Sequence, residues 1–562
     1  MNAELARLRE QVRRQPQDFV AWLMLADVEM ETGEAMAAQA SVQHALMLRP
    51  GHPEALARLG RLMWMRGRQD EAIRALGQAA AIAPQHPGIA LWLGHALEDG
   101  GREEAAAEAY AHALTLAPDE PYFAAQLLNM RRRLCDWRDV DALSARLRRA
   151  LAAGQPVIEP FAFLSEDAAP AEQLVCARLR ARAIATHVHP MPPPGPRLPG
   201  PLRLGFLSNG FGAHPTGLLT VSLFEALARR GRQVHLFALN SDDGSAIRRR
   251  LHTATDMHDV SGMPHHAIAS TIRTTDIDVL FDLRGWGGGG APEVLAMRPA
   301  RLQVNWLAYP GTSGAPWIDA VLADDFVLPA ALAAHFSERA IRLPRAFQPS
   351  DNTRIAGTPP ARADCGLPTS ATVFCCFNNS YKLNPRSMGR MFAVLRGVPE
   401  SVLWLLSGPG HADQRLRDAT RAAGIAPERL VFAHKRSHPE YLALYRHADL
   451  FLDTSPYNAH TTASDALWAG CPVLTVPGST FASRVAGSLN HHLGLDDMNA
   501  CDDASFIERA IALARQPGAL AGLRRRVDER RRLSTVFDMD GFAVDMLAVI
   551  EREAAAAGIA AK

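Results

Sequence analysis

Hydrophobic and polar positions follow two different periods along this chain, and the change falls near residue 202. Before it, apolar residues recur every three or four positions, which is the spacing of helices that bury one face. After it, short apolar runs typical of buried strands alternate with helical stretches. The first of these strands are expected at 203–208, 234–239, 278–283 and 302–307. This alternation predicts βα units, whose parallel sheets are covered by helices on both faces.

A second series of apolar runs predicts a second sheet further along the chain. Its strands are expected at 373–377, 402–406, 430–432, 449–454 and 472–477. Residues 344–370 are rich in proline and poor in periodicity, so we interpret them as a crossover between domains. The pattern therefore predicts two doubly wound, Rossmann-like domains, 202–343 and 371–540, with a cleft between the carboxyl ends of their strands. A final helix is expected at 541–562.

The helical part contains a repeat of 34 residues. Proline recurs at 16, 50, 84 and 118, and glycine at 33, 67 and 101. Small residues, Ala26, Gly60 and Gly94, occupy the positions where two helices would cross closely. This spacing is the tetratricopeptide pattern, in which each repeat is a helix pair and successive pairs stack into a superhelix. We therefore predict tetratricopeptide repeats over 1–118, a helical bridging and capping segment over 119–188, and a proline-rich linker over 189–201.

The composition narrows the classes of protein that fit this organisation. A net charge of +1 over 562 residues argues against a nucleic-acid binder. No apolar run reaches the roughly 18 residues that cross a bilayer, and the first residues lack the layout of a signal peptide. The 7 cysteines include no C-x-x-C pair, which favours reduced thiols over disulfides or a zinc site. We expect a cytoplasmic protein with no membrane segment. We interpret the arginine-rich run 524–532 as a solvated helix face, with nucleic-acid binding as the minor alternative.

Two loops at the expected strand ends of the first domain carry candidate chemistry. The strand at 203–208 leads into a loop in which His214 follows two glycines and precedes a proline that fixes its direction. A histidine at the carboxyl end of a strand suits proton transfer near neutral pH. The alternative is that its ring only hydrogen-bonds its own loop. The strand at 302–307 leads into a tight loop, 306–314, that is rich in glycine and hydroxyl groups.

The second domain places a cation and a helix start at comparable strand ends. Lys382 follows the strand at 373–377, where it could meet an anion. Thr461 and Thr462 begin a short helix between two buried strands, and the positive end of a helix is a natural phosphate site. The competing interpretation is a purely structural capping box, with Thr462 as N-cap and Asp465 at the third helical position. Walker A, H-E-x-x-H and G-x-S-x-G motifs are absent from the sequence.

Four separated motifs carry a resemblance to a known family. They are HPTG at 214–217, YPGTSG at 309–314, FNNSYK at 377–382 and HTTASDALWAG at 460–470. In this order, behind a tetratricopeptide array, they resemble the protein O-linked N-acetylglucosamine transferases, specifically their bacterial homologues. The resemblance implies a GT-B fold and an inverting transfer from UDP-N-acetylglucosamine to serine or threonine of proteins. It also implies that neither a metal nor another cofactor is needed.

The resemblance also implies roles for particular residues. Lys382 would neutralise the donor diphosphate, which gains charge as UDP leaves, and Asp465 would bind the ribose hydroxyls. The other donor contacts implied in the second domain are Asn379, His460, Thr461 and Thr462. In the first domain, the loop approaching the sugar and phosphates would contribute Gly311, Thr312 and Gly314. His214 matches the histidine proposed as general base, a role contested within the family, and we predict it only as an active-site residue.

The chain departs from the animal members of the family at the base pocket and in the repeats. Tyr441 is predicted to stack on the nucleotide base where animal members have a histidine, with Arg436 supplying main-chain contacts. The concave positions of the repeats hold Met24, Arg58 and Trp92 in place of an asparagine ladder, so a protein or peptide acceptor in the tetratricopeptide groove would be held differently. Two alternatives stay open: a protein O-fucosyltransferase that uses GDP-fucose, and a tetratricopeptide scaffold with a non-catalytic nucleotide-binding module.

Overall fold

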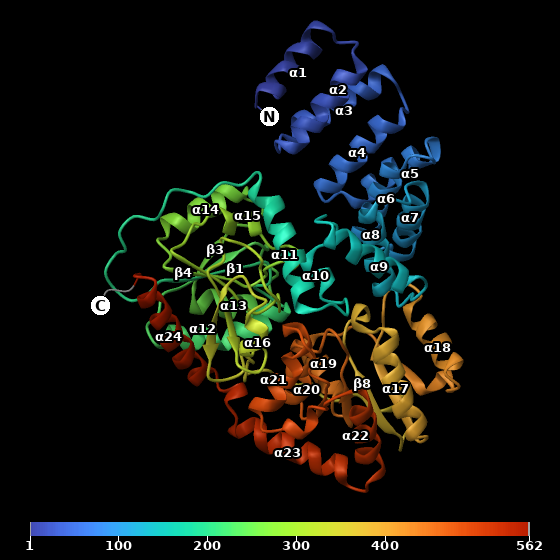
Figure 1. Ribbon diagram of the computed structural model, residues 1–562, viewed down its shortest axis with the longest axis vertical. Coiled ribbons are helices and arrows are strands. Elements are labelled where there is room, and N and C mark those ends of the chain that lie inside the picture. Colours follow the sequence, from blue (N-terminus) through green and yellow to red (C-terminus); the bar gives the residue numbers. More distant parts are fainter. Residues whose placement is uncertain (1, 560–562) are drawn as a thin grey trace. The chain divides into compact units, whose positions relative to one another are not determined.

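The computed structural model describes residues 2–559, and the chain divides into two compact units. The first unit holds the residues up to 149 together with the short segment 408–413, and the second holds 150–407 and the residues from 414 onward. Figure 1 shows that the first unit is built of helices, whereas both sheets lie in the second. The helices of the first unit and its border are α1 (Asn2–Arg14), α2 (Phe19–Glu31), α3 (Ala35–Leu48), α4 (Pro53–Met65), α5 (Gln69–Ile82), α6 (Pro87–Asp99), α7 (Glu103–Leu116), α8 (Pro121–Arg133) and α9 (Val140–Ala152).

The tetratricopeptide prediction is confirmed by how these helices pair. The helices pack as consecutive antiparallel pairs, α2 with α3, α4 with α5 and α6 with α7. A Cβ added to Gly60 would lie 2.5 Å from Leu76, and one added to Gly94 would lie 2.4 Å from the ring of Tyr110. The small residues are therefore required where the two helices of a repeat cross. The glycines at 33, 67 and 101 adopt φ angles of +78°, +71° and +67°, which the tight turn inside each repeat needs.

The first sheet of the second unit is parallel and has seven strands in the order β3-β2-β1-β4-β5-β6-β7. Its strands are β1 (Leu204–Ser208), β2 (Val234–Ala238), β3 (Asp256–Asp259), β4 (Val279–Asp282), β5 (Leu302–Asn305), β6 (Ala320–Asp324) and β7 (Arg339–Leu343). The helices of this region are α10 (Pro160–Phe163), α11 (Pro170–Ala185), α12 (Pro215–Arg229), α13 (Ala246–Ala254), α14 (His265–Thr274), α15 (Pro292–Ala296) and α16 (Ala330–Ala333). Buried aromatic rings, Phe206, Phe281 and Trp306 among them, fill one face of this sheet.

The second sheet is also parallel, with five strands in the order β10-β9-β8-β11-β12. Its strands are β8 (Thr372–Cys376), β9 (Ser401–Leu406), β10 (Leu430–Ala433), β11 (Leu450–Leu452) and β12 (Val473–Leu474). The helices around it are α17 (Pro385–Gly397), α18 (Ala412–Ala422), α19 (His438–Leu444), α20 (Thr461–Trp468), α21 (Val485–His492), α22 (Asp503–Arg515) and α23 (Ala519–Leu533). The strand order reverses between β8 and β11, which is where a doubly wound sheet binds its ligand.

The last helix returns to the first sheet. Helix α24 (Met539–Ala556) packs against α12 and β7, and Figure 1 shows it lying along α12. Phe542, Met546 and Ile550 join the apolar core of the first domain. The end of the chain therefore ties the second domain back to the first.

Two features of this unit differ from the sequence-based expectations. Strands β3, β6 and β7 were not predicted; β3 and β7 lie at the two edges of the sheet and carry charged residues, so their apolar pattern is weak. The arginine-rich run is not simply a solvated helix face. Arg524 of α23 donates to the carbonyl groups of Tyr445, which caps α19, and of Ala448 after the following turn, and Arg531 donates to Trp468 O at the end of α20. Guanidinium groups favour helix carboxyl ends, so these arginines hold α23 in place.

Candidate functional site

The candidate site lies where β8, β11 and the start of α20 come together at the switch point of the second sheet. Strand β8 is followed by the turn Ser380–Lys382, and β11 is followed by a loop that leads to Thr461, the first residue of α20. Both segments begin at the carboxyl end of a strand, and the second one leads to the amino end of α20. The topology thus gathers the residues that the sequence placed far apart.

Lys382 is buried at this switch point and forms no ion pair with a carboxylate among the residues described. Its Nζ donates a hydrogen bond of 2.7 Å to Asn458 O and lies 3.8 Å from the centroid of the Tyr457 ring. Burial lowers the pKa of Lys382 to about 7, against the opposing effect of Asp453. The ammonium is therefore a positive charge that an anion in the crevice would stabilise.

Asp453, directly after β11, is the carboxylate that organises the neighbouring loop. It is fully buried, and its oxygens accept hydrogen bonds of 2.7 Å from Thr454 N, Ala459 N and Thr475 Oγ1. Asn378 Nδ2 donates to it at 3.2 Å. Burial raises the pKa of Asp453, whereas the hydrogen bonds it accepts lower it. Sequence reasoning did not single out this residue, although an aspartate that ends a buried strand was a usable signal.

The start of α20 is not closed by a capping box, so the purely structural interpretation is wrong. The helix begins at Thr461, and no side chain caps it. The Thr462 hydroxyl instead donates to Asn378 Oδ1 at 2.9 Å, which links the helix start to the end of β8. The carboxylate of Asp465 is occupied elsewhere. The amino end of α20 therefore keeps its positive dipole end available beside Lys382.

Asp465 is held by two side chains, those of Arg354 and His438. Its Oδ1 accepts a 2.6 Å bond from Arg354 Nη1 and lies 3.1 Å from His438 Nε2. The Arg354–Asp465 ion pair is almost completely buried, with exposed side-chain fractions of 2% and 5%. Within the described part of the chain, Oδ2 accepts no hydrogen bond from a side chain. That oxygen is free to meet a hydroxyl group.

The predicted base pocket contains a pair of tyrosines. The hydroxyl groups of Tyr441 and Tyr445 are 2.7 Å apart, and Tyr445 also donates to Thr462 O at 3.3 Å. The Tyr441 ring packs against Phe377, with 5.7 Å between ring centroids, and its partly exposed position suits a stacking role. Arg436 is exposed on the neighbouring loop, and its side chain forms no hydrogen bond or ion pair to the described residues.

His460 and Asn379 are the two remaining predicted donor contacts near Lys382. The Nε2 of His460 lies 3.1 Å from Ala482 O, so this nitrogen carries the proton and Nδ1 is an acceptor. Burial and the nearby Lys382 charge hold the pKa of His460 well below its ordinary value. The ring is consequently neutral. Asn379 is exposed immediately before the turn that carries Lys382.

In the first domain, His214 is the residue that caps α12. Its Nδ1 accepts the Thr216 N–H at 3.2 Å, so the neutral ring carries its proton on Nε2. Burial, with a contribution from the Arg284 charge, lowers the pKa of His214 to about 4. The side chain passes so close to Gly210 that a Cβ there would lie 2.4 Å from Nδ1. His214 is therefore a neutral hydrogen-bond donor in this arrangement.

The glycine loop of the first domain is anchored to the protein behind it. The Thr312 hydroxyl donates to Glu338 Oε2 at 2.8 Å, and Ser313 N donates to Glu338 Oε1 at 2.7 Å. Gly314 has φ +62°, and a Cβ there would lie 2.5 Å from the backbone of α11. The hydroxyl of Thr312 is thus engaged with Glu338, and these contacts explain why the loop needs small residues.

Arg284 and Tyr457 link the two halves of the site. Arg284, which follows β4, acts electrostatically on both His214 and Tyr457. Tyr457 packs in one apolar cluster with Tyr309 of the first domain, and its ring lies under Lys382. Through Arg284 and Tyr457, His214 and Lys382 are thus connected across the two domains. Arg284 was not predicted from the sequence, because its loop is glycine-rich but matches no motif.

Two Rossmann-like domains in one chain, with a buried lysine and an uncapped helix start at the switch point of the second sheet, are the arrangement of glycosyltransferases of the GT-B class. The comparisons with known proteins identify the family. The chain belongs to glycosyl transferase family 41, whose family model matches residues 189–358 and 358–546. A tetratricopeptide repeat model matches residues 63–128.

Similar proteins include named peptide transferases. The chain is 32% identical over 438 residues to the probable UDP-N-acetylglucosamine–peptide N-acetylglucosaminyltransferase SEC of Arabidopsis thaliana, covering 73% of this chain and 45% of that protein. It is 27% identical over 459 residues to the UDP-N-acetylglucosamine–peptide N-acetylglucosaminyltransferase of Caenorhabditis elegans, covering 61% and 40%. The chain thus spans less than half the length of these curated relatives.

A solved structure matches nearly the whole chain. The O-GlcNAc transferase of Thermobaculum terrenum, determined as a point mutant, superposes with a TM-score of 0.70 at 26% sequence identity. The match covers 96% of this chain and 98% of that one. The expected order of a tetratricopeptide array followed by a GT-B region is therefore confirmed. Among the described residues, no helix has the length and apolar character needed to span a membrane.

Proposed function

We propose that this chain transfers N-acetylglucosamine from UDP-N-acetylglucosamine to serine or threonine hydroxyls of proteins, with inversion and without a metal. Membership of family 41 and the names of the similar proteins support the substrate class. The observation that carries the proposal is the buried Lys382 beside the uncapped start of α20. Together they supply the positive charge that a leaving diphosphate needs, which is the task a metal ion performs in other transferases.

The proposed donor pose uses the contacts around α20. The diphosphate lies between Lys382 and the N–H groups of Thr461 and Thr462, where the helix dipole favours negative charge. The ribose meets the free oxygen of Asp465, which Arg354 holds in place. The base stacks on Tyr441, and the sugar extends toward His460 and the first domain.

In the proposed reaction, the acceptor hydroxyl oxygen attacks the anomeric carbon from the side opposite the diphosphate. The new bond joins that oxygen to the anomeric carbon, while the bond from the carbon to the β-phosphate oxygen breaks and UDP leaves with the electron pair. The hydroxyl proton passes to water. His214 orients the acceptor or this water as a hydrogen-bond donor, because its Nε2 carries the proton and its pKa is lowered to about 4.

We further propose that the acceptor chain binds along the repeats. The first helices of successive repeats, α2, α4 and α6, contact one another and form a continuous face. On this face a hollow of about 340 Å³ is lined by Asp27, Arg58, Arg61 and Trp92. Arg58 pairs with Asp27 at 2.8 Å, and Arg61 lies over the Trp92 ring at 4.6 Å. A groove with both charge signs and an aromatic ring suits an extended polar peptide.

The donor can be tested with a panel of nucleotides. Thermal shifts with UDP and with GDP separate the N-acetylglucosamine proposal from the fucosyl alternative, since ligand at 100 times its Kd stabilises a protein by about 2.7 kcal/mol. We expect UDP to stabilise the chain and GDP to have no effect. Stabilisation by GDP alone would support GDP-fucose, and no stabilisation by either nucleotide would support a non-catalytic scaffold.

Transfer itself is tested by mass spectrometry of proteins incubated with UDP-N-acetylglucosamine and the purified chain. We expect N-acetylhexosamine on serine or threonine, removed by Lys382→Ala with the fold intact by circular dichroism. Lys435→Ala is a matched control, because Lys435 is exposed on the loop after β10. Undiminished transfer by Lys382→Ala would contradict the assigned role of this lysine.

A further inference from the structure

Another cavity lies at the carboxyl end of α20, the end opposite the proposed diphosphate site. It is separate from the sites described above. It has a volume of about 480 Å³ and is formed by the crossover 344–370, the end of α20, α23 and the residues after α19. Its lining residues are Asn352, Arg354, Ala356, Arg446, Trp468, Ala469, Arg531, Arg532 and Phe537. None of the residues assigned to the diphosphate, base or sugar lines it.

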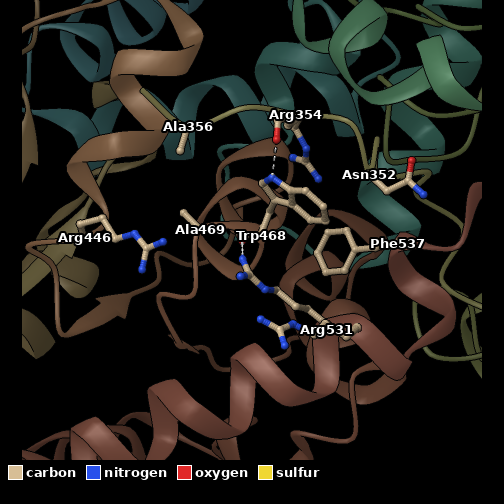
Figure 2. Close-up of a pocket in the computed structure, with 9 residues that line it drawn as sticks. Asn352, Arg354, Ala356, Arg446, Trp468, Ala469, Arg531 and Phe537 are labelled. Carbon is tan, nitrogen blue, oxygen red and sulfur yellow. Dashed lines mark hydrogen bonds between the residues drawn. The ribbon is translucent and has the colours of Figure 1, made fainter. Parts of the chain in front are cut away.

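The charges around this cavity are unbalanced. Arg354 is neutralised by Asp465, and Arg531 by Asp528 on its own helix at 3.1 Å. Arg446 and Arg532 are both exposed, and neither pairs with a carboxylate within the described range. Figure 2 shows Arg446 on one side of the cavity and Arg531, Trp468 and Phe537 on the other. Two guanidinium charges are thus left over at the cavity wall.

These charges act on one another. Burial lowers the pKa of Arg531, and the positive charges of Arg446 and Arg532 lower it further, while Asp528 opposes them. Like charges gathered around a hollow cost free energy, and a bound anion would offset that cost. A phosphate monoester carries a charge of about −2 near neutral pH, and its oxygens match guanidinium groups in bidentate geometry.

We propose that this cavity binds a phosphate dianion, free or as the monoester of a small metabolite, held by Arg446 and Arg532. The cavity is large enough for a phosphate with a sugar-sized group attached. Trp468 and Phe537, whose ring centroids are 5.1 Å apart, give the attached group an apolar wall.

The cavity is also connected to the proposed donor site. Trp468 Nε1 donates to Arg354 O at 3.1 Å, and the Arg354 guanidinium lies 5.4 Å from the centre of the Trp468 ring. The same guanidinium holds Asp465 on its other side. An anion that shifts Trp468 or Arg354 therefore changes how Asp465 meets the ribose, and the coupling is reciprocal. Only this coupling rests on the proposed function; the anion site stands without it.

Calorimetric titration with glucose 6-phosphate and, separately, inorganic phosphate tests the site in the full chain. We expect binding that weakens at least about 10-fold in the double variant Arg446→Ala/Arg532→Ala, as loss of charge-assisted hydrogen bonds implies. Both side chains are exposed and unpaired, so the variant should fold. Arg525→Ala is the control, because Arg525 is exposed on the same helix but does not line the cavity. Tighter binding of the sugar phosphate identifies a metabolite site, and equal binding identifies a site for free phosphate.

Three results would overturn the proposal. They are no binding of either probe at millimolar concentration, binding unaffected by the double variant, and binding lost in Lys382→Ala, which would place the probe in the donor crevice. The coupling is measured as the Kd of UDP with and without saturating probe, and we expect a change of at least about threefold. An unchanged Kd refutes the coupling. If UDP itself does not bind, the proposed function fails while the phosphate titration still decides the anion site.

Discussion

The buried Lys382 makes the affinity for UDP depend on pH. Burial lowers the pKa of this lysine from 10.5 to about 7, which corresponds to about 5 kcal/mol of lost stabilisation of the ammonium form. A diphosphate beside the side chain favours the charged form and raises the pKa again. UDP binding should therefore take up a proton whenever the lysine of the free protein is neutral.

The size of this effect follows from the pKa. With a value of about 7, roughly half of the free lysine is neutral at pH 7 and about nine-tenths at pH 8. If only the ammonium form holds the diphosphate, the Kd rises about 5-fold from pH 7 to 8 and about 50-fold from pH 7 to 9. The terminal phosphate of UDP, like other phosphate monoesters with a pKa of about 6, is already ionised over this range and adds little.

The same pKa fixes the sign of the stability change without ligand. The folded pKa of Lys382 lies below the unfolded value, so the unfolded chain binds more protons between pH 7 and 10.5. The contribution of this group to the free energy of unfolding consequently rises with pH over that window. Raising the pH should therefore stabilise the UDP-free protein against unfolding while it weakens the binding of UDP.

Isothermal titration with UDP at pH 7, 8 and 9, in two buffers of different ionisation enthalpy, measures both the Kd and the proton uptake. We expect an uptake close to one proton at pH 9. The control is Lys382→Met, which keeps the length of the side chain and should bind UDP weakly with no dependence on pH. An equal Kd at pH 7 and 9 in the unaltered chain, or the same slope in the variant, would refute the reasoning.

Three further predictions concern other parts of the chain. Asp453→Asn cannot accept all the hydrogen bonds that the carboxylate accepts from the loop after β11, so this loop should loosen and UDP affinity should fall about 10-fold by calorimetry. An unchanged Kd would show that the loop keeps its conformation without the Asp453 carboxylate. His214→Asn keeps a helix cap but removes the imidazole, so kcat should fall. Because the pKa of His214 is about 4 and that of Lys382 about 7, any inflection of kcat/KM near neutral pH should come from the lysine and persist in the variant; an inflection near pH 6.5 that the variant lacks would contradict this. Gly94→Ala forces a Cβ against Tyr110 and should lower the free energy of unfolding of the repeats by about 1–3 kcal/mol, measured in urea. Gly77 on α5 faces open space, so Gly77→Ala should raise that free energy by about 0.5–1 kcal/mol. Equal effects of the two substitutions would refute the packing argument.

The sequence predicted those elements whose apolar residues follow a strong period. It did not predict exposed elements, which lack such a period. The glycines at 60 and 94 identified the repeat because only they allow the helices to cross so closely. Both buried strands that flank the crevice, β8 and β11, appeared as apolar runs. In contrast β3, with the sequence Asp256–Asp259, is an exposed edge strand, and only its pairing with β2 makes it a strand.

The site was predictable only as far as its motifs reach. Lys382 and Thr462 were predicted as donor contacts because one follows a buried strand and the other lies at a helix start between two buried strands. Arg354 could not be found, because it lies in an irregular crossover and acquires its role from Asp465, which is 111 residues away in the sequence. Asp465 itself was assigned to the ribose or to a capping box, and the structure excludes only the second. Distant partners decide the function of such residues, and local patterns do not record them.

A scaffold whose second domain no longer binds a nucleotide conflicts with the local energetics around Lys382. A buried ammonium without a carboxylate partner, such as Lys382, is an arrangement that costs free energy in the empty protein. A helix start without a side-chain cap, as at Thr461, gives up about 1 kcal/mol that a serine or aspartate would contribute. The two unfavourable features are neighbours in the structure, and one bound diphosphate would offset the free-energy cost of both. A module with no anion to bind gains nothing from either, so their coincidence argues for a site that still binds a diphosphate, and the transfer assay then separates catalysis from binding alone.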